Sequence, residues 1–290
     1  MSELLVGTES GIIDLHTGQI HLQGRPVRAL TDRWAIVGTS VLVERTGDGE
    51  WGERLESPHS LTALTVCGDD VLLGTSTGEV VGFDGTARPV PGFDRVEGRD
   101  QWHAVGSSKP YVRSMSTSSD GVVFANVHVG GIPRSTDGGK TWEPTIDVEA
   151  DVHEVVAHPD RPEVVLAAAA VGLAVSRDAG ATWTVHTEGL HGAYSRAVAV
   201  SGDVVFVSAS TGPFTDRAAI YRRSLDNDEP LERVGDWLDG NVDSGRLVSA
   251  GDAVAFGGPD GRLRVSDDGG GTWRESSDSA SVTALVYSHT

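Results

Sequence analysis

The apolar residues of this chain are grouped in short runs that recur with a regular spacing. Runs at 27–30, 61–64 and 112–115 each begin a segment in which a polar turn, a Val-rich run and two further short runs follow. Runs of this length, separated by Gly and Asp, are typical of β-strands joined by tight turns. The repeat length of about 40–45 residues is that of a four-stranded β-propeller blade.

Seven such units can be followed along the chain. The first begins at Leu4 and has no opening run of its own, whereas residues 281–287 match an opening run with nothing after it. The C-terminal segment can therefore complete the first unit, which removes two open sheet edges with unpaired backbone groups. The pattern predicts an all-β fold in a single domain, residues 1–290. This domain is a seven-bladed β-propeller of four-stranded antiparallel blades, its ring closed by the C-terminal strand joining the N-terminal blade.

The pattern S-x-D-x-G-x-T-W occurs three times, at 135–142, 176–183 and 266–273. Its Asp and Ser/Thr oxygens can accept hydrogen bonds from the backbone N–H groups of a tight turn, and its Gly allows the positive φ that such a turn requires. The final Trp begins the outgoing strand and can bury its ring against a neighbouring element. The motif is therefore predicted to stabilise a β-hairpin.

These motifs resemble the Asp-box, or bacterial neuraminidase repeat, of sialidases, xyloglucanases, sortilin-type receptors and photosystem II assembly factors, all of them β-propellers. The repeat frame is most similar to cytoplasmic Asp-box proteins that are labelled sialidase-like or glycosyl hydrolase without demonstrated activity. The resemblance implies the propeller fold. It does not define a function, because function depends on sites that differ among proteins of one fold.

Acidic residues far outnumber basic ones. The chain has 42 Asp and Glu against 23 Lys and Arg, a formal net charge of −19, and Lys only at 109 and 140. Such a surface suits a protein that stays hydrated in molar salt, where screening limits charge repulsion to ~3 Å. This predicts a halophilic, salt-in cytoplasm, as in halophilic archaea, with an ordinary acidic soluble protein as the alternative.

The same composition bears on partners and localisation. Nucleic acid binding needs a basic face, which this acidic chain is not expected to have, so no nucleic acid partner is expected. Apolar runs stay well below the ~18 residues of a membrane span, and the N-terminus lacks the features of a signal peptide. We therefore expect a monomer that is cytoplasmic and not membrane-embedded.

Two connections are longer than the repeat requires. Residues 94–110 lie between the third and fourth units, and residues 211–219 lengthen the sixth. Long connections on a rigid scaffold often carry binding residues, although a surface loop without a role is the alternative.

Alignment of the units gives one position, the second residue of each opening strand, that is polar in all seven units and ionisable in five. Innermost propeller strands run around the central channel, so these residues are expected near one mouth of it. An otherwise Val/Leu/Ala strand has no packing reason for Arg or His there, which favours a ligand-facing mouth. The alternative is that these groups bind channel water and one another. The aligned residues are Arg28, Thr62, Arg113, His153, Arg196, Asp243 and Thr283.

Further polar residues concentrate in units four to six. His128 interrupts an apolar run, where a satisfied core histidine is the alternative, and Tyr194 can serve as an aromatic platform. The favoured function is a non-catalytic binding or scaffolding module that uses this mouth to bind a protein partner or a small anionic ligand. The predicted contacts are Arg113, His128, His153, Tyr194, Arg196 and Asp243.

The alternative function is a glycosidase-like hydrolase acting at the same mouth. The resemblance to sialidases implies three Arg that clamp a carboxylate, which Arg28, Arg113 and Arg196 could imitate. However, the sialidase signature F/Y-R-I-P is missing, since residues 131–134 read G-I-P-R, and seven units are counted instead of six. The carboxylate pair of other glycosidases, ~5–10 Å apart, cannot be placed from the sequence. These absences favour a non-catalytic role and leave open whether the chain is an enzyme; if it is one, a glycoside hydrolase is expected.

No cofactor or metal is expected. The Asp-rich turns lack the spacing and distal Glu of a calcium loop, the His residues lack zinc-site spacing, and no glycine-rich phosphate-binding motif opens a helix.

Overall fold

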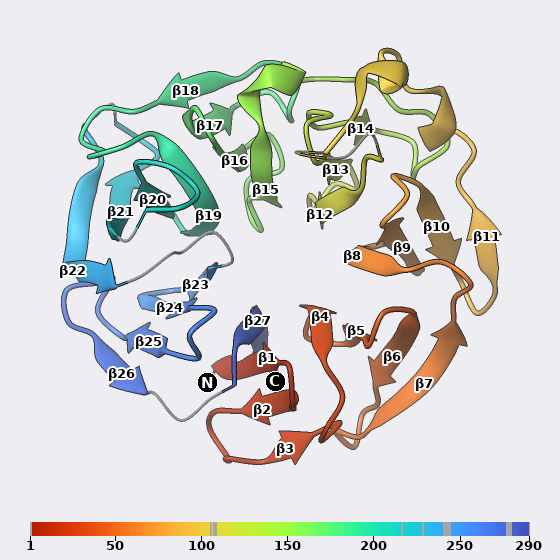
Figure 1. Ribbon diagram of the computed structural model, residues 1–290, viewed down its shortest axis with the longest axis horizontal. Helices are drawn as coiled ribbons and strands as arrows, with labels where there is room; N and C mark the ends of the chain where they lie inside the picture. Colours follow the sequence, from red (N-terminus) through yellow and green to blue (C-terminus); the bar gives the residue numbers. More distant parts are fainter. Residues whose placement is uncertain are drawn as a thin grey trace. The chain divides into compact units, whose positions relative to one another are not determined.

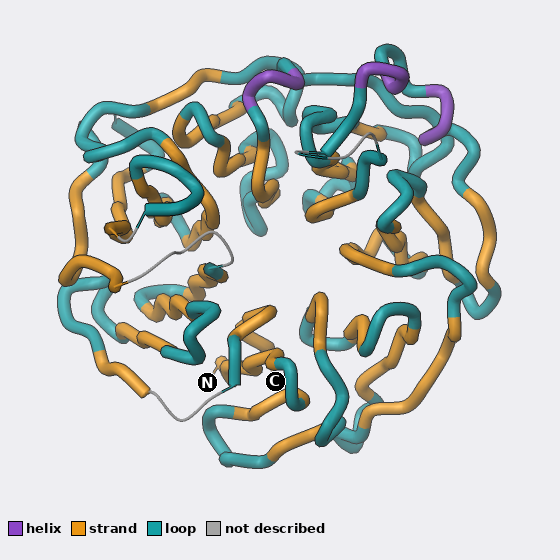
Figure 2. The backbone as a smooth tube through the Cα atoms, viewed as in Figure 1, coloured by secondary structure: helices purple, strands orange, loops and turns teal. Residues whose placement is uncertain are grey.

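The computed structural model describes residues 2–104, 106, 109–215, 217–227, 229–239, 245–276 and 280–289. Strands dominate these residues, and the helical elements among them are three short turns of 3-10 helix (Figure 2). None of the helices described is long and apolar enough to cross a membrane. The predicted all-β class is confirmed. The 3-10 turns are η1 (Phe93–Arg95), η2 (Arg99–Gln101) and η3 (Val148–Ala150).

The chain packs as two compact units, which we call the terminal unit (1–56 with 187–290) and the central unit (57–186). The expectation of a single domain therefore stays a prediction. The terminal unit contains four antiparallel sheets. In sheet order these are β27 (Val282–His289), β1 (Ser2–Thr8), β2 (Gly11–Asp14) and β3 (Ile20–His21); β4 (Val27–Leu30), β5 (Trp34–Val37), β6 (Val41–Arg45) and β7 (Trp51–Glu56); β19 (Tyr194–Ser201), β20 (Val204–Ser210), β21 (Arg217–Ser224) and β22 (Glu232–Asp239); and β23 (Arg246–Ala250), β24 (Ala253–Gly257), β25 (Leu263–Ser266) and β26 (Arg274–Ser276).

The central unit contains three further antiparallel sheets. The middle one has three strands, and the chain then continues beside it through an isolated antiparallel bridge between Arg134 and Glu143. In sheet order the strands are β8 (Leu61–Cys67), β9 (Asp70–Thr75), β10 (Val80–Phe83) and β11 (Ala87–Pro89); β12 (Val112–Thr117), β13 (Val123–Val127) and β14 (Arg134–Ser135); and β15 (Val152–Ala157), β16 (Val165–Ala169), β17 (Gly172–Ser176) and β18 (Thr184–His186).

The two ends of the chain share one sheet. Strand β1 lies between β27 and β2, and Leu4 pairs with Tyr287 and Val6 with Leu285 in an antiparallel register (Figure 1). The C-terminal strand thus occupies the place of the opening strand that the first repeat lacks. The predicted closure is confirmed.

Burial explains why the second strand of each repeat is so rich in Val and Ala. Every residue of β5 and β16 is buried, because sheets packed on both sides leave no solvent face, whereas the outer strand β18 exposes Thr184 and Val185. Such strands read as continuous apolar runs instead of alternating ones. In the central unit, Phe124, Ile132 and Val165 belong to one buried cluster that joins two successive sheets.

The Asp-box turns form the predicted hydrogen bonds. In the first copy, Ser135 Oγ accepts a hydrogen bond from the Gly139 N–H at 2.8 Å, and Asp137 Oδ1 accepts one from the Thr141 N–H at 2.9 Å. The Thr141 hydroxyl donates to Asp137 Oδ2 at 2.7 Å. The other two copies repeat these bonds with distances of 2.6–2.9 Å. The motif is therefore a local folding device, as its residue types indicate.

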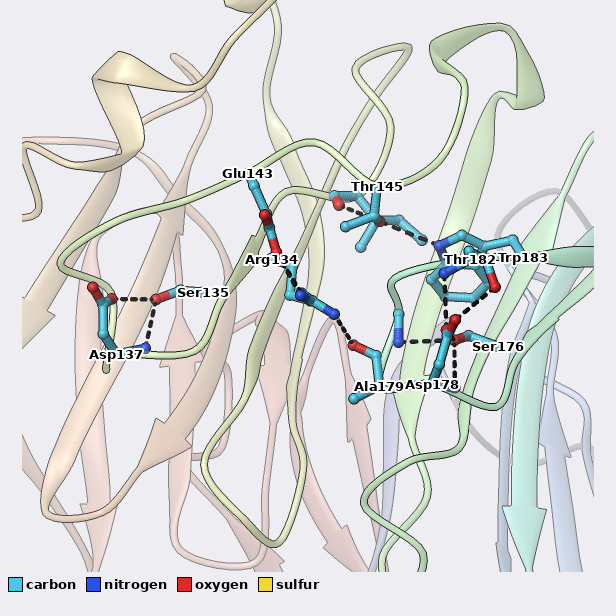
Figure 3. Close-up of polar contacts among 12 residues, drawn as sticks. Arg134, Ser135, Asp137, Glu143, Thr145, Ser176, Asp178, Ala179, Thr182 and Trp183 are labelled. Atoms are coloured by element: carbon cyan, nitrogen blue, oxygen red, sulfur yellow. Dashed lines mark hydrogen bonds and ion pairs between the residues drawn. The ribbon is translucent and has the colours of Figure 1, made fainter.

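Side chains next to two of these turns also connect successive sheets of the central unit (Figure 3). Arg134 donates to Glu143 Oε1 at 3.0 Å and to the backbone carbonyl of Ala179, in the second Asp-box, at 2.9 Å. Thr145 Oγ1 accepts a hydrogen bond from Trp183 Nε1 at 3.2 Å and donates to the Ile132 carbonyl at 2.8 Å. The turns are thereby fixed relative to each other as well as internally.

Candidate functional site

A β-bulge occupies the aligned position in six of the seven opening strands. The pairing register of each strand shifts by one residue there, so an extra residue is inserted and its side chain is redirected. The seventh residue, Asp243, lies outside the described residues. In the third unit the aligned residue, Thr62, comes directly before Ala63, which pairs with Gly74. In the seventh unit the equivalent pair is Arg246 with Gly257, so the residue at the aligned position is Gly245. The six bulge residues are Arg28, Thr62, Arg113, His153, Arg196 and Thr283.

Two of these bulge residues have clear structural roles. The Thr62 hydroxyl donates to the carbonyl of Val112, in the next opening strand, at 2.6 Å. Arg28 Nε donates to the carbonyl of Gly38 at 2.6 Å. A polar residue at a bulge can therefore satisfy backbone groups, so its polarity alone does not identify a ligand contact.

The central unit gathers polar groups around Asp151. This residue ends the turn η3, directly before β15, and its Oδ2 lies 3.6 Å from His153 Nε2, while its Oδ1 lies 3.8 Å from His128 Nε2. Both separations exceed a normal hydrogen bond, so they are electrostatic contacts. The side chain of His153 is fully buried and that of His128 is 12% exposed. We call Tyr111, Arg113, His128, Asp151 and His153 the histidine site.

Opposing effects act on the Asp151 carboxyl group. Burial raises its pKa, but His153, and then the charges of His128 and Arg113, outweigh burial, so the pKa lies below the ordinary value of an aspartate. The group is therefore ionised at neutral pH. Its Oδ1 is buried and accepts no hydrogen bond from any residue that the structure describes.

The backbone of the histidine site is strained. Val129, directly after His128, has φ of 45°, and Asp151 has φ of 46°. Positive φ is uncommon for residues other than Gly and is an outlier for a β-branched residue such as Val. Conformations of this kind cost of order 1–3 kcal/mol and cluster at functional sites. Two of the four such non-glycine residues in the described part of the chain flank the two histidines.

The described residues of the 94–110 connection pack against the core next to this site instead of forming a free surface loop. Trp102 is 5% exposed, and its ring packs at 5.5 Å from Phe93, which is fully buried. The His103 N–H donates to the Val129 carbonyl at 3.3 Å. At the end of the connection, the Tyr111 carbonyl accepts the His128 N–H at 3.0 Å, and the two rings meet edge to face at 5.0 Å.

Comparisons with known proteins agree with this architecture. The family model of the BNR/Asp-box repeat matches residues 134–144, which contain the whole of the first of the three motifs. No curated protein matches the chain. A structure of YCF48 bound to D1 peptide is 16% identical, with 87% of this chain and 82% of that chain covered and a TM-score of 0.60.

Two further solved structures extend the likeness. The WD40 β-propeller domain of Doa1 is 13% identical, with 98% of this chain and 89% of that chain covered and a TM-score of 0.63. An ancestral GH74 enzyme is also 13% identical, with 98% of this chain but 39% of that chain covered and a TM-score of 0.62. The chain is a seven-bladed β-propeller. Identities this low establish the fold alone.

The propeller distributes the predicted site residues over both units. Arg113, His128 and His153 come together around Asp151 in blades four and five of the central unit. Tyr194, half-buried, and Arg196, 7% exposed, lie at the start of β19 in blade six of the terminal unit. The mouth that would join them all stays a prediction.

Sequence reasoning missed Asp151 and Tyr111. Asp151 could have been found from the pattern Asp-Val-His, which puts a carboxylate two residues before the bulge histidine of blade five. Tyr111 has no comparable signal, because its contact with His128 depends on the pairing of two strands. Neither spacing nor composition reports such a contact.

The histidine site is chemically suited to binding. Its buried carboxylate oxygen can accept a hydrogen bond from a ligand N–H or O–H, and Arg113 and the histidines can donate to an anion or a carbonyl. The groups around Asp151 are imidazoles and a guanidinium, whereas glycoside hydrolysis uses a second carboxylate. No group of three or more metal-ligating side chains with metal-binding geometry occurs among the residues described.

Proposed function

We propose that this propeller is a non-catalytic binding or scaffolding module and that the histidine site is its contact surface in the central unit. The observation that carries the proposal is Asp151 Oδ1, a buried carboxylate oxygen without a hydrogen-bond donor among the described residues. Leaving such an oxygen without a hydrogen bond costs about 1–3 kcal/mol, and a ligand that donates to it removes this cost. Strained backbone on either side of the site supports the same conclusion.

The occupant that suits the site best is a protein partner. A peptide segment offers N–H groups, from which Asp151 can accept hydrogen bonds. It also offers carbonyl oxygens, to which Arg113 and His128 can donate. A small anionic ligand would satisfy the cations but would leave the carboxylate without a donor. Propellers of this fold include one solved with a bound peptide and the WD40 domain of Doa1. Tyr194, Arg196 and Asp243 are proposed as additional contacts.

The test compares proteins captured by immobilised wild-type chain with those captured by the R113Q/H128Q double variant, from a lysate at native salt, using quantitative mass spectrometry. The matched control is R161Q, a guanidinium beyond the opposite end of β15 that pairs with Glu163 at 3.6 Å. We expect at least one protein whose captured amount falls at least tenfold with the double variant and is unchanged with R161Q. Equal thermal unfolding midpoints show that all three proteins are folded.

Two results would contradict the proposal. One is capture of the same proteins, in the same amounts, by the wild type and the double variant. The other is hydrolysis of a panel of chromogenic glycosides that Asp151→Asn abolishes, because this would establish the glycosidase-like alternative at the same site. The salt-in cytoplasm remains part of the proposal, and the capture is therefore made in high KCl.

A further inference from the structure

Blade six carries a second group of side chains that the histidine site does not include. The guanidinium carbon of Arg217 lies 3.8 Å from the centroid of the Trp237 ring, and that of Arg233 lies 4.7 Å from it. Both arginines are exposed and Trp237 is half-buried. We call these residues, with His191 and Tyr221, the arginine–tryptophan patch.

Within the patch, His191 and Tyr221 hold the Trp237 ring in place. The His191 ring meets the Trp237 ring edge to face at 4.8 Å. Tyr221, which is 2% exposed, places its hydroxyl 2.7 Å from His191 Nδ1 and accepts the His191 N–H at 3.3 Å. The buried tyrosine therefore fixes His191, and His191 in turn fixes one edge of Trp237. A contact surface with its side chains already ordered loses less entropy on binding.

Charge makes this patch unusual in a chain of net charge −19. Neither Arg217 nor Arg233 forms an ion pair with a carboxylate of the residues described, whereas Arg25 pairs with Glu53 at 2.8 Å and Arg262 with Asp260 at 3.3 Å. A guanidinium stacked on an aromatic ring keeps its N–H edge available for contact with a carboxylate. Arg233 also donates from Nη1 to the Gly235 carbonyl at 2.9 Å, so its remaining N–H groups are the ones available. Two such groups on one ring favour an anionic partner.

An exposed aromatic residue lies in the connection that leads to Arg217. Phe214 is 92% exposed, three residues before Arg217, in the 211–219 segment that lengthens blade six. The contacts that contribute most to protein–protein binding are enriched in Trp, Tyr and Arg. A free inorganic anion would make no use of an apolar ring, whereas a peptide side chain would.

We propose that the arginine–tryptophan patch, together with Phe214, docks an acidic peptide segment that also carries apolar side chains. Carboxylates of the segment contact Arg217 and Arg233, and an apolar side chain packs on Phe214. The inference rests on the proposal that the propeller is a binding module. It does not depend on the histidine site, which belongs to the central unit.

The test is a titration followed by NMR, in which the ¹⁵N-labelled full chain receives a synthetic peptide of repeated Asp-Leu-Glu. The resonances observed are the Nε–Hε groups of Arg217 and Arg233 and the indole N–H of Trp237. We expect saturable shifts at these three groups. The R217Q/R233Q double variant is expected to bind the peptide at least tenfold more weakly, as measured at the Trp237 indole, and Phe214→Ala at least threefold more weakly.

The matched control is the R25Q/R262Q double variant, which removes the same charge from guanidinium groups that already have carboxylate partners. It should bind the peptide within twofold of the wild type at the Trp237 indole. This resonance reports the arginine–tryptophan patch and not the histidine site, so a failure here is distinct from a failure of the capture test. Absence of saturable shifts, or an equal loss in R25Q/R262Q, would overturn the proposal. Equal or tighter binding of inorganic phosphate at the same resonances would also overturn it, in favour of a small-anion site.

Discussion

At the scale of single residues, the Asp-box turns show how closely the backbone conformation determines the residue type. The position after the motif aspartate has a positive φ in all three copies, 71° at Gly138, 53° at Ala179 and 65° at Gly269. In the left-handed region a Cβ atom approaches the following carbonyl oxygen, which costs roughly 1–2 kcal/mol. The second copy therefore carries a residue that strains its own turn.

Replacing this alanine should stabilise the protein. Ala179→Gly relieves the strain, and part of that gain is offset by the larger entropy of glycine in the unfolded chain, so the free energy of unfolding should rise by about 0.5–1 kcal/mol. Urea denaturation measures the change. Ala181→Gly is the control, because its φ is not positive, and it should leave stability unchanged or lower it. A stabilisation by Ala181→Gly of equal size would contradict the strain argument.

The motif aspartates should also contribute to acid sensitivity. Hydrogen bonds from Thr141 lower the pKa of Asp137 to about 2, from 3.8 in the absence of such contacts. A carboxyl group with a depressed folded-state pKa stabilises the fold above its unfolded pKa, and this contribution is lost as the pH falls from about 4 to about 2. The equivalent hydrogen bonds, from Thr182 and Thr272, lower the pKa values of Asp178 and Asp268 to about 2.

Asp137→Asn should therefore lower the free energy of unfolding at pH 7 by about 1–2 kcal/mol, the usual contribution of hydrogen bonds to a partly exposed charged group. Between pH 4 and pH 2 the variant should lose less stability than the wild type. Denaturation curves at a series of pH values measure both effects. Parallel pH profiles of the two proteins would show that Asp137 is not the titrating group.

Residue roles inside a local motif could be predicted, because all partners lie within eight positions of the sequence. The site around Asp151 could be predicted only in part. His128 and His153 were identified by their polarity in apolar strands, but their contact with Asp151 depends on how blades four and five pack. The bulges were also not predicted, because a register shift depends on the partner strand.

At the scale of strands, hydroxyl groups join neighbouring blades of the central unit. Ser114 Oγ, on β12, accepts the Val155 N–H of β15 at 3.1 Å, and Ser116 Oγ accepts the Ala157 N–H at 2.9 Å. The hydroxyls of Thr65 and Thr117 meet at 2.9 Å between β8 and β12. Serine hydroxyls in one opening strand thus accept hydrogen bonds from backbone N–H groups of the next blade that strand pairing does not satisfy.

Ser114→Ala should destabilise the protein by about 1–3 kcal/mol, because it leaves the buried Val155 N–H without an acceptor. Urea denaturation measures the loss, and hydrogen exchange should speed up at Val155 more than at residues of β16. Ser119→Ala, at an exposed turn, is the control and should have an effect within about 0.5 kcal/mol. Equal effects of the two substitutions would contradict the role of the Ser114 hydroxyl.

The starts of the opening strands in units two to six and of the C-terminal strand could be predicted to within one residue, because repeated copies of one pattern reinforce one another. The role of the 94–110 connection could not. The sequence allows it to be a surface loop without a role, yet its Trp102 is buried in one cluster with Phe93 and Trp142. Only tertiary packing distinguishes a connection that covers a core from one that is free in solvent.

At the scale of the whole molecule, the acidic composition predicts a dependence of stability on salt. Repulsion among like charges destabilises a compact state of net charge −19, and KCl screens it over about 10 Å at 0.1 M and about 3 Å at 1 M. The free energy of unfolding should therefore rise between 0.1 and 2 M KCl. The variant D32N/D69N/D160N, which neutralises three exposed carboxylates, should show a smaller rise. An equal rise in both proteins would contradict a charge-repulsion mechanism.

The central claim about the whole molecule is that seven blades form a closed scaffold held by the pairing of β27 with β1. Its most direct test is equilibrium unfolding in urea of the full chain and of a chain that lacks residues 281–290. We predict a single cooperative transition for the full chain, and a loss of at least several kcal/mol or failure to fold for the shortened one, because β1 then becomes an open sheet edge. A shortened chain with an unchanged unfolding midpoint would contradict the account.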